Sequence, residues 1–292
     1  MKFTIRDFRQ RFPDDDACLC EVMRLRYGSV TTCPYEDCAK ETKFHRVTGR
    51  RCYECQWCGY QVYPTKGTIF EKSSTPLQLW FYAIYLMTAT RSGVSAKELQ
   101  RQLGVTYKTA WRMAHEVRKL MGSRSIIRLH GQVEIDETYI GGARRGTSGR
   151  GALGKTPVVG MVQRHGPIRA KAMPNVRRVH VLPLITQTVS RQATIFTDEY
   201  TTYIPLKSLG YRHQTVEHGT REYVRGRAHT QTIEGFWSQL KRSISGTHVW
   251  VSKEHLQRYV DEFAFRFNHR HRPAEMFTLL LSYLARTAPT PC

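Results

Sequence analysis

The chain has 292 residues, of which 45 are Lys or Arg and 24 are Asp or Glu, so its formal net charge is +21. This length is enough for roughly two domains with a sizeable buried core. The basic excess is spread along the chain, with eight basic and two acidic residues in 76–125 alone. We therefore expect a polyanionic partner, most simply nucleic acid, rather than a generic basic protein.

The sequence contains no export or membrane-insertion signal that we can identify. Residues 1–11 lack the uninterrupted apolar core and small-residue cleavage site of a secretion signal. The longest apolar run, LQLWFYAIYLMTA (residues 77–89), is too short to cross a bilayer and predicts a buried helix. We expect a cytoplasmic protein, associated with the bacterial nucleoid, that makes no membrane contact.

The N-terminal region, residues 1–72, contains seven of the eight cysteines. Two short-spaced cysteine pairs on either side of a hairpin-length segment are what a tetrahedral Zn²⁺ site requires. Cys52 and Cys55 have the same CxxC spacing as Cys55 and Cys58, so either could be the second pair. Gly59 favours the latter, because a glycine lets the knuckle turn. We predict a structural zinc ribbon with the ligands Cys33, Cys38, Cys55 and Cys58.

Residues 73–125 form a helical segment that contains SAKELQRQLGVTYKTAWRMAHEVRKLM. Ser95 and Glu98 fit a capping box, Gly104 permits a sharp turn, and Thr106 can cap a second helix that runs to about Leu120. This pattern is typical of a helix-turn-helix, whose second helix reads DNA in the major groove. An ordinary helical hairpin would give the same pattern. The side chains expected to face outward toward DNA are Lys108, Arg112, His115 and Arg118.

Residues 126–292 alternate between strands and helices, which predicts a mixed α/β architecture. One helix is expected at 179–189 and another at 229–243, and a third, amphipathic helix at 253–268 packs on the core. The expected strands are 131–142, 156–164, 167–174, 193–200 and 211–218.

Two aspartates fall where a strand would normally avoid charge. Asp136 lies within a hydrophobic strand and Asp198 ends another. A carboxylate beside a core is costly unless it pairs or binds metal. Two carboxylates on neighbouring strands, with a third from a helix, would form a hard oxygen site suited to Mg²⁺. Two ions ~3.5–4 Å apart could then activate a nucleophile and stabilise a leaving oxygen in phosphoryl transfer.

The helix predicted at 229–243 has two distinct stripes. Its apolar stripe includes Ile233 and Trp237 and should face the core. Glu234 and Lys241 lie on a neighbouring stripe, ~10 Å apart along the axis, which is too far for an ion pair. Glu234 could hold metal while Lys241 contacts a DNA phosphate.

Several neighbouring residues have more than one interpretation. Strand alternation places Glu134 on the same face as Asp136 and Glu137 on the opposite face, and we expect Glu137 and Glu199 to lie at the surface or outside the metal-binding set. The Gly-rich basic stretch GGARRGTSGRGALGK could follow a phosphate backbone through Arg144 and Arg145, or be only a flexible hairpin.

Several separated motifs together resemble the IS1595-family (ISXO2-like) insertion-sequence transposases. They are GYQVYPTKGTIFE after the cysteine pairs, EIDETYIGG, GKTPVVGMV and EYVRGRAHTQTIEGFWSQLKR, in the expected order from about Cys33 to Arg272. The resemblance implies an RNase H-like DDE catalytic domain, a mixed sheet flanked by helices, preceded by a zinc ribbon and a helix-turn-helix segment.

The resemblance also implies an activity and a set of residues. The implied chemistry is metal-dependent cleavage of DNA at the transposon ends, followed by strand transfer into target DNA, with Mg²⁺ or Mn²⁺ as cofactor. Asp136 and Asp198 resemble the first two acids, Glu234 the third, with Gln231 as the alternative third ligand, and Lys241 the basic residue two turns later. Arg242 beside it would also contact DNA.

The expected partners are the terminal inverted repeats and target DNA, bound by a homo-oligomer. Two other functions remain open: a zinc and helix-turn-helix regulator that has lost catalysis, and an RNase H-like nuclease that does not join strands. A regulator need not keep the three acids and Lys241 together.

Overall fold

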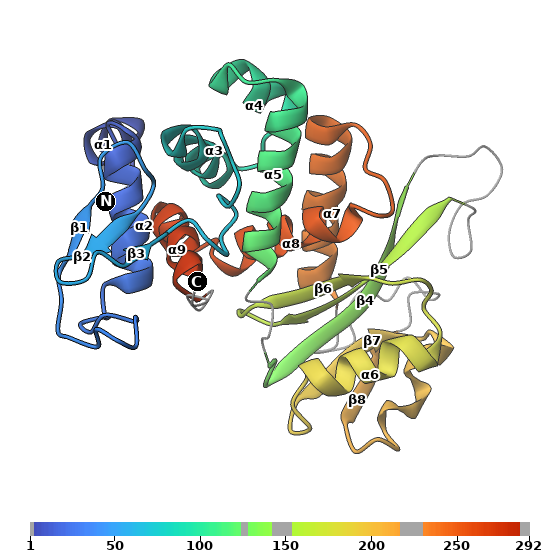
Figure 1. The fold of residues 1–292 in the computed structure, drawn as a ribbon. Helices are drawn as coiled ribbons and strands as arrows, with labels where there is room; N and C mark the ends of the chain where they lie inside the picture. Colours follow the sequence, from blue (N-terminus) through green and yellow to red (C-terminus); the bar gives the residue numbers. More distant parts are fainter. Residues whose placement is uncertain (1–2, 124–127, 142–153, 217–229, 287–292) are drawn as a thin grey trace. The chain divides into compact units, whose positions relative to one another are not determined.

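The computed structural model describes residues 3–123, 128–141, 154–216 and 230–286 (Figure 1). Its internal contacts divide the chain into two compact units, Met1–Leu120 together with Arg272–Cys292, and Met121–His271. Each unit has its own sheet, so the chain as a whole is mixed α/β, as the sequence predicts. In the described part of the chain, no helix is both long enough and apolar enough to cross a membrane.

The first unit is built on helices that begin with good N-caps and meet in an aromatic core. Thr4 caps the first helix with a complete capping box, and the Asp14 side chain accepts from the backbone of the second. Phe12 and Phe277 lie 5.8 Å apart between ring centroids, which joins the two ends of the chain. The helices of this core are α1 (Ile5–Arg11), α2 (Asp15–Tyr27), α3 (Leu77–Ala89) and α9 (Met276–Ser282).

The cysteine-rich segment of this unit forms a small antiparallel sheet. Its strands are β1 (Phe44–Arg46), β2 (Tyr53–Cys55) and β3 (Gln61–Val62), in that order. Cys55 ends β2 and Gly59 follows the knuckle with φ of 69°, which is the left-handed turn that favours glycine.

The predicted pair of short helices is present, as α4 (Ala96–Leu103) and α5 (Tyr107–Gly122). The Ser95 hydroxyl accepts from the backbone N–H of Glu98, Gly104 has φ of 65°, and the Thr106 hydroxyl accepts from the N–H of Thr109. Ser95, Gly104 and Thr106 therefore have the predicted cap and turn roles, and the second helix continues two residues past Leu120. The reciprocal half of the predicted capping box is not formed, because the Glu98 carboxylate accepts from Arg101 and Gln102 instead.

The expectation that His115 and Arg118 face outward is wrong. Both side chains are buried, each with a relative exposure of 1%. The Arg118 guanidinium donates to the carbonyl of Val94 at 3.4 Å, and the His115 ring packs 4.0 Å from the ring of Trp111. The prediction assumed that α5 buries one apolar face and exposes its polar residues. In its second half, α5 is buried on more than one face, so His115 and Arg118 are buried as well.

The second unit contains a five-stranded sheet in the order β6-β5-β4-β7-β8. β5 is antiparallel to β4 and β6, whereas β7 is parallel to β4 and β8. All five strands lie where the sequence predicts them. They are β4 (Gln132–Gly141), β5 (Lys155–Gln163), β6 (Ile168–Ala172), β7 (Thr194–Asp198) and β8 (Arg212–Val216).

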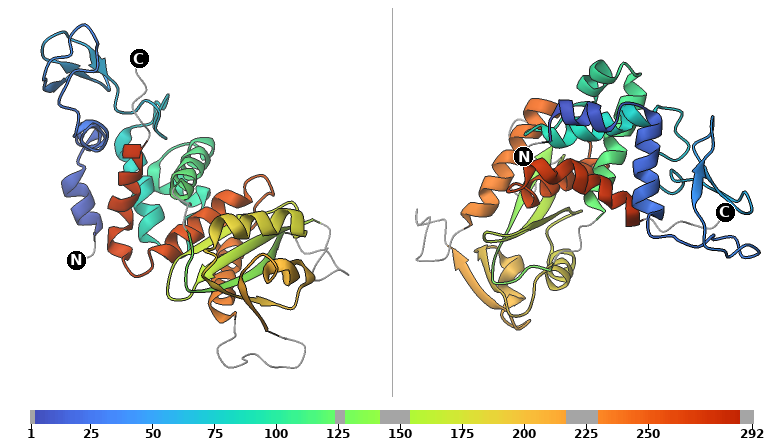
Figure 2. Two further views of the ribbon diagram at one scale, coloured as in Figure 1. Left: turned by 90° about the horizontal axis from the view of Figure 1, so that it is seen from below. Right: turned by 90° about the vertical axis from the view of Figure 1, so that its left-hand side faces the viewer.

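The alternating side chains of β4 divide the core of this unit into two layers. Val133 and Ile135 face a cluster that includes Val181 and Ile185 of α6 (Arg178–Thr188) and Leu206 of the 3₁₀-helix η1 (Thr201–Leu206). Residues on the other face of the sheet pack against α7 (Gln231–Ser243) and α8 (Leu256–Asn268). Figures 1 and 2 show α6 on one side of the sheet and α7 and α8 on the other.

Short helical turns complete the described chain. The π-helix η3 (Ile244–His248) follows α7 directly, and the 3₁₀-helices η4 (Pro273–Glu275) and η5 (Tyr283–Arg286) flank α9.

Candidate functional site

The strand register places Asp136 and Asp198 side by side. In the parallel ladder between β4 and β7, Glu134 is opposite Phe196, and each aspartate lies two residues further along its own strand. Equivalent positions on parallel neighbours point to the same face of the sheet. Both side chains are half-buried. The first two predicted acids therefore share one face and one end of the sheet.

Asp136 lies in an environment that disfavours its charge. Burial, and then the negative charges of Glu137 and Asp198, raise the pKa of Asp136 to about 7. The indole N–H of Trp237, on α7, donates to Oδ2 of Asp136 at 2.9 Å. A cation bound between the two aspartates would relieve this repulsion, so the donor set fits a divalent metal.

Glu134 holds the N-terminus of α7 against the sheet. Its carboxylate is fully buried and accepts from the backbone N–H groups of Thr232 at 2.9 Å and Ile233 at 3.1 Å. It also accepts from the Thr232 hydroxyl at 3.1 Å. Free backbone N–H groups and the helix dipole both favour an anion at this position. Glu134 thereby fixes where α7 begins relative to β4.

The buried charge of Glu134 is balanced by Arg164, which directly follows β5. The two side chains form an ion pair of 2.8 Å between Nε and Oε1, and the arginine is only 9% exposed. Its guanidinium also lies 4.2 Å from the ring centroid of Phe196 and donates to Gln132 at 3.1 Å. This network joins β4, β5 and β7 to the start of α7.

Gly160 allows α7 to approach the sheet closely. It is opposite Asp136 in the antiparallel ladder between β4 and β5. A Cβ at this position would lie 2.7 Å from two ring carbons of Trp237 and 3.0 Å from Cδ1 of Ile233. The absent side chain therefore leaves the space in which the Trp237 ring packs while its N–H reaches Asp136.

Glu234, the third predicted acid, lies one turn before Trp237 on α7 and is exposed. It accepts from the Thr230 hydroxyl at 3.0 Å. Gln231, the alternative third ligand, is also exposed. Among the residues that the structure describes, the three acids do not form a group close enough to hold one ion. The structure thus pairs Asp136 with Asp198 and leaves Glu234 on the adjacent helix.

The basic residues expected to contact DNA differ in their exposure to solvent. Lys108, Lys241 and Arg242 are exposed. Arg112 is exposed too, although its guanidinium lies 5.5 Å from the Trp80 ring centroid and donates to the Ser73 hydroxyl at 2.9 Å. Arg144 and Arg145 lie outside the described residues.

Glu137 was expected at the surface or outside the metal-binding set. It faces away from α7, as alternation predicts, but its side chain is buried and accepts from the Tyr203 hydroxyl at 2.9 Å. Burial, and next the charge of Glu137, raise the pKa of Tyr203 well above its ordinary value. Glu199, by contrast, is exposed as expected.

Sequence reasoning missed the roles of Glu134, Trp237 and Tyr203. The sequence does indicate that Glu134 shares a face with Asp136, but not that its partners come from residues 232 and 233. The signal for Trp237 was present, because a tryptophan on the core-facing stripe of a helix has an N–H that needs an acceptor.

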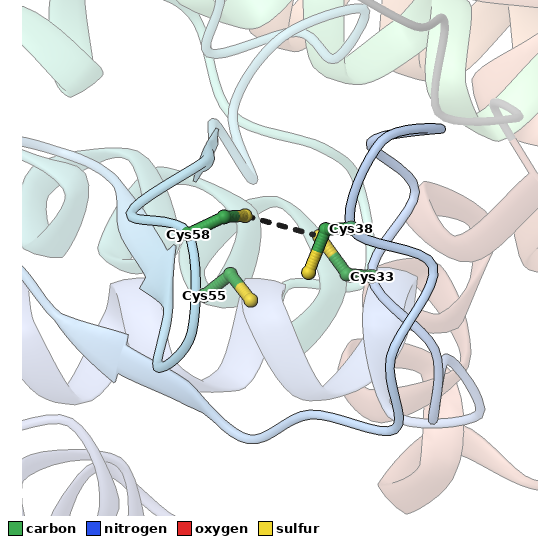
Figure 3. Close-up of side chains that lie close together, drawn as sticks. All are labelled: Cys33, Cys38, Cys55 and Cys58. Atoms are coloured by element: carbon green, nitrogen blue, oxygen red, sulfur yellow. Dashed lines mark hydrogen bonds between the residues drawn. The ribbon is translucent and has the colours of Figure 1, made fainter.

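The four predicted zinc ligands converge in the first unit. The sulfur atoms of Cys33, Cys38, Cys55 and Cys58 all lie within 4.8 Å of one another. Cys52, the alternative ligand, is fully buried outside this group. Figure 3 shows the four side chains pointing toward one another, with 3.7 Å between the sulfurs of Cys33 and Cys58.

This geometry fits a structural zinc site. Zn–S bonds of about 2.3 Å in a tetrahedron require sulfur atoms a little under 4 Å apart. The hydroxyl of Thr42 lies 3.1 Å from the Cys55 sulfur, and the backbone N–H of Trp57 donates to the same sulfur at 3.4 Å. Such contacts orient a thiolate ligand. The four cysteines form a group that could hold zinc.

Known proteins resemble this chain over most of its length. An ISXO2-like transposase domain matches residues 128–268. A protein of Halobacterium salinarum, described as an uncharacterized protein in transposable element ISH50, is 31% identical over 278 residues, which cover 86% of this chain and 90% of that protein. An uncharacterized transposase-like protein of Haemophilus influenzae is 28% identical over 97 residues, covering 33% of this chain and 77% of its own.

A solved structure, described as a pre-cleavage Mos1 transpososome, is 12% identical in sequence. The match covers 70% of this chain and 79% of that chain, and its TM-score of 0.27 supports no structural argument.

The family match covers β4 to α8, and the relative from Halobacterium matches 86% of the chain. The resemblance to these transposases is confirmed, and the chain belongs to the ISXO2-like transposase family.

Proposed function

We propose that this protein is a DDE-type DNA transposase that binds the ends of its insertion sequence and catalyses metal-dependent strand cleavage and strand transfer. The observation that supports this most strongly is the register of Asp136 and Asp198 on one face of the sheet, with α7 fixed beside them. Family membership supports DNA as the substrate, and the mixed sheet with helices on both faces supports an RNase H-like catalytic domain.

Asp136, Asp198 and Glu234 would hold Mg²⁺ or Mn²⁺. Two bound ions would supply Lewis-acid stabilisation of the attacking and leaving oxygens of the phosphodiester. Asp136 is held by the Trp237 N–H, and Asp198 by the backbone N–H of Tyr200 at 3.1 Å. We favour Glu234 over Gln231 because a carboxylate binds Mg²⁺ more strongly than a neutral amide.

Lys241 would contact the DNA backbone. It follows Glu234 by seven residues on the same side of α7, about 10 Å along the helix axis. An ammonium group at this distance would bind a phosphate about three nucleotides from the scissile bond and hold the strand in register. The exposed Arg242 beside it would add a second phosphate contact.

The first unit would recognise DNA. We propose that the four-cysteine group binds Zn²⁺ as a structural ribbon, and that α4 and α5 act as a helix-turn-helix with Lys108 and Arg112 toward the DNA. The role in DNA binding does not extend to His115 and Arg118, which are buried. A homo-oligomer on paired ends would bring the two ends of the element together.

The test is a strand-cleavage and strand-transfer assay on the terminal sequences that flank the gene. Asp136→Asn, Asp198→Asn and Glu234→Gln should each lower the rate by about 100-fold or more, the scale expected when electrostatic stabilisation of a transition state is lost. Gln231→Ala should have a milder effect. Glu199→Gln is the matched control, because it removes an exposed carboxylate next to Asp198.

The same assay separates the remaining alternatives. Cleavage without joining would indicate a nuclease. End binding without cleavage by the unmodified protein would indicate a regulator. An acid whose substitution leaves the rate unchanged would lose its place in the site.

A further inference from the structure

The segment after α7 exposes two large apolar side chains. The π-helix Ile244–His248 ends α7, and the next two residues, Val249 and Trp250, are 81% and 66% exposed. π-helical turns are rare and are often found at functional sites. We call Val249 and Trp250 the apolar tip.

The backbone at the tip is strained. Val249 has φ of 64° and ψ of −52°, and the N–H of Trp250 donates to the carbonyl of His248 at 2.7 Å. These values describe a classic γ-turn, a rare and strained conformation, at a β-branched residue that seldom adopts positive φ. A conformation of this kind persists only where the surroundings hold it.

Buried neighbours on both sides hold the turn. Ile244 precedes it and Val251 follows it, and both are buried in the cluster beneath α7 and α8. The ring of His248 packs edge-on against that of Tyr259, 4.8 Å between centroids. The turn is therefore anchored, while the side chains at its tip remain at the surface.

The tip lies in a strongly basic part of the chain. Lys241 and Arg242 precede it and Lys253 follows it, and all three are exposed. No acidic residue occurs in the sequence between Glu234 and Glu254. An exposed apolar tip in a predominantly basic stretch of chain suits a polyanion that also has flat apolar faces, which describes the backbone and bases of DNA.

We infer that the apolar tip binds DNA, with Trp250 stacked on a base that is unstacked in the bound DNA and Val249 packed beside it. This inference rests on the proposed function. Trp250 lies beyond the C-terminal end of α7, and the nine residues from Glu234 to Ser243 alone extend about 14 Å at about 1.5 Å per residue. At about 3.4 Å per nucleotide along DNA that follows α7, the contacted base is at least about four positions from the cleavage site.

The inference is tested with Trp250→Ala and Trp250→Phe in the full-length protein. The probe is a duplex of the element's terminal sequence, either intact or with one abasic position at each of the ten nucleotides nearest the cleavage site. We expect Trp250→Ala to weaken binding by about 10-fold, the scale of one base–aromatic stack, and Trp250→Phe to retain most of the affinity. Ile204→Ala, which shortens an equally exposed apolar side chain on η1, should bind as the unmodified protein does.

The abasic scan identifies the stacked base. At that position the missing base should weaken binding by the unmodified protein but not by Trp250→Ala, because the two changes remove the same contact. A 5-iodouracil at that position should crosslink to Trp250 on irradiation. Because Trp250 is exposed, its variants should melt within a few degrees of the unmodified protein.

Three results would overturn the inference. Equal affinity of Trp250→Ala and the unmodified protein would do so while leaving the proposed function intact, provided that both cleave. Loss of self-association in Trp250→Ala, with unchanged DNA affinity, would show that the tip contacts a second copy of this chain. An unmodified protein that neither binds nor cleaves the terminal DNA would overturn the inference and the proposed function together.

Discussion

Replacing Glu134 should destabilise the second unit more than any exposed acid, although Glu134 touches no substrate in the proposed site. Its carboxylate forms an ion pair with Arg164 and accepts from the backbone N–H groups of Thr232 and Ile233. Glu134→Gln removes the charge but keeps the shape. Arg164, only 9% exposed, then keeps a charge without its counterion. Removing one partner of a buried ion pair typically costs about 3–5 kcal/mol.

Urea unfolding followed by tryptophan fluorescence would measure this loss, because Trp237 is buried beside Asp136. The same variant should also lose strand cleavage, since the start of α7, which carries Glu234, would no longer be fixed against β4. The matched control is Glu98→Gln, which breaks an exposed pair with Arg101 in α4. Exposed pairs contribute about 0–1 kcal/mol, so this control should change little.

A double-mutant cycle sharpens the argument. Combining Glu134→Gln with Arg164→Met removes both charges, so the double variant should be more stable than the sum of the single losses predicts. A Glu134→Gln protein that lost less than about 1 kcal/mol would refute the reasoning. It would mean that the carboxylate does not balance a buried charge or hold the helix.

Three further predictions concern other parts of the fold. Gly160→Ala should cost about 1–3 kcal/mol and lower cleavage, because a Cβ at 2.7 Å would displace the Trp237 ring. Metal analysis should find one zinc ion per chain, which Cys33→Ser abolishes and Cys52→Ser does not. Burial raises the pKa of Asp261 to about 6, so the unmodified protein should lose about 2–3 kcal/mol relative to Asp261→Asn as pH rises from 4 to 7.

The sign of the Asp261 effect follows from linkage. The folded protein binds this proton more tightly than the unfolded chain, so its contribution is fully present below about pH 4 and disappears as pH rises through 6. Chemical unfolding of both proteins from pH 3.5 to 8 checks this, with exposed Glu254→Gln as control.

Gly235→Ala is the control for Gly160→Ala, because nothing lies within 4 Å of a Cβ at Gly235 and alanine favours a helix. Parallel stability-versus-pH curves for the unmodified protein and Asp261→Asn would contradict the Asp261 prediction. A Gly160→Ala protein of normal stability would contradict the Gly160 prediction, and zinc loss in Cys52→Ser would contradict the assignment of the zinc ligands.

Local pattern was sufficient to predict the five strands and the helices α6, α7 and α8 of the second unit, but not its short helices η1 and η3. Alternation identified the strands around Asp136 and Asp198, and the 3.6-residue period identified α7 with Trp237 on its buried side. These patterns are short-range consequences of which side chains face the core. Spacing likewise identified the two cysteine pairs, and Gly59 after Cys58 favoured Cys58 over Cys52 without excluding it; the structure leaves Cys52 outside the group.

Burial across elements could not be predicted in the same way. His115 and Arg118 are polar residues on an amphipathic helix, so a pattern places them in solvent, yet each is 1% exposed. Whether a polar group is buried depends on partners distant in sequence, such as the Val94 carbonyl for Arg118. The N-terminal helices α1 and α2 were not predicted at all, although Thr4 and Asp14 are good caps.

The EIDE segment of β4 illustrates why one motif can contain three different kinds of acid. Alternation directs Glu134 and Asp136 toward α7 and Glu137 to the other face. Glu134 reaches the start of the helix and takes a counterion, whereas Asp136 is near a second acid and accepts from the indole N–H of Trp237.

These surroundings determine what each carboxylate can do. A carboxylate that already accepts three hydrogen bonds and an ion pair has little capacity left for a metal ion. Asp136, whose pKa is raised to about 7 by burial and by neighbouring acids, is the one that gains most from a cation. The strand thus carries, two residues apart, an acid that positions the start of α7 and the acid proposed to bind metal.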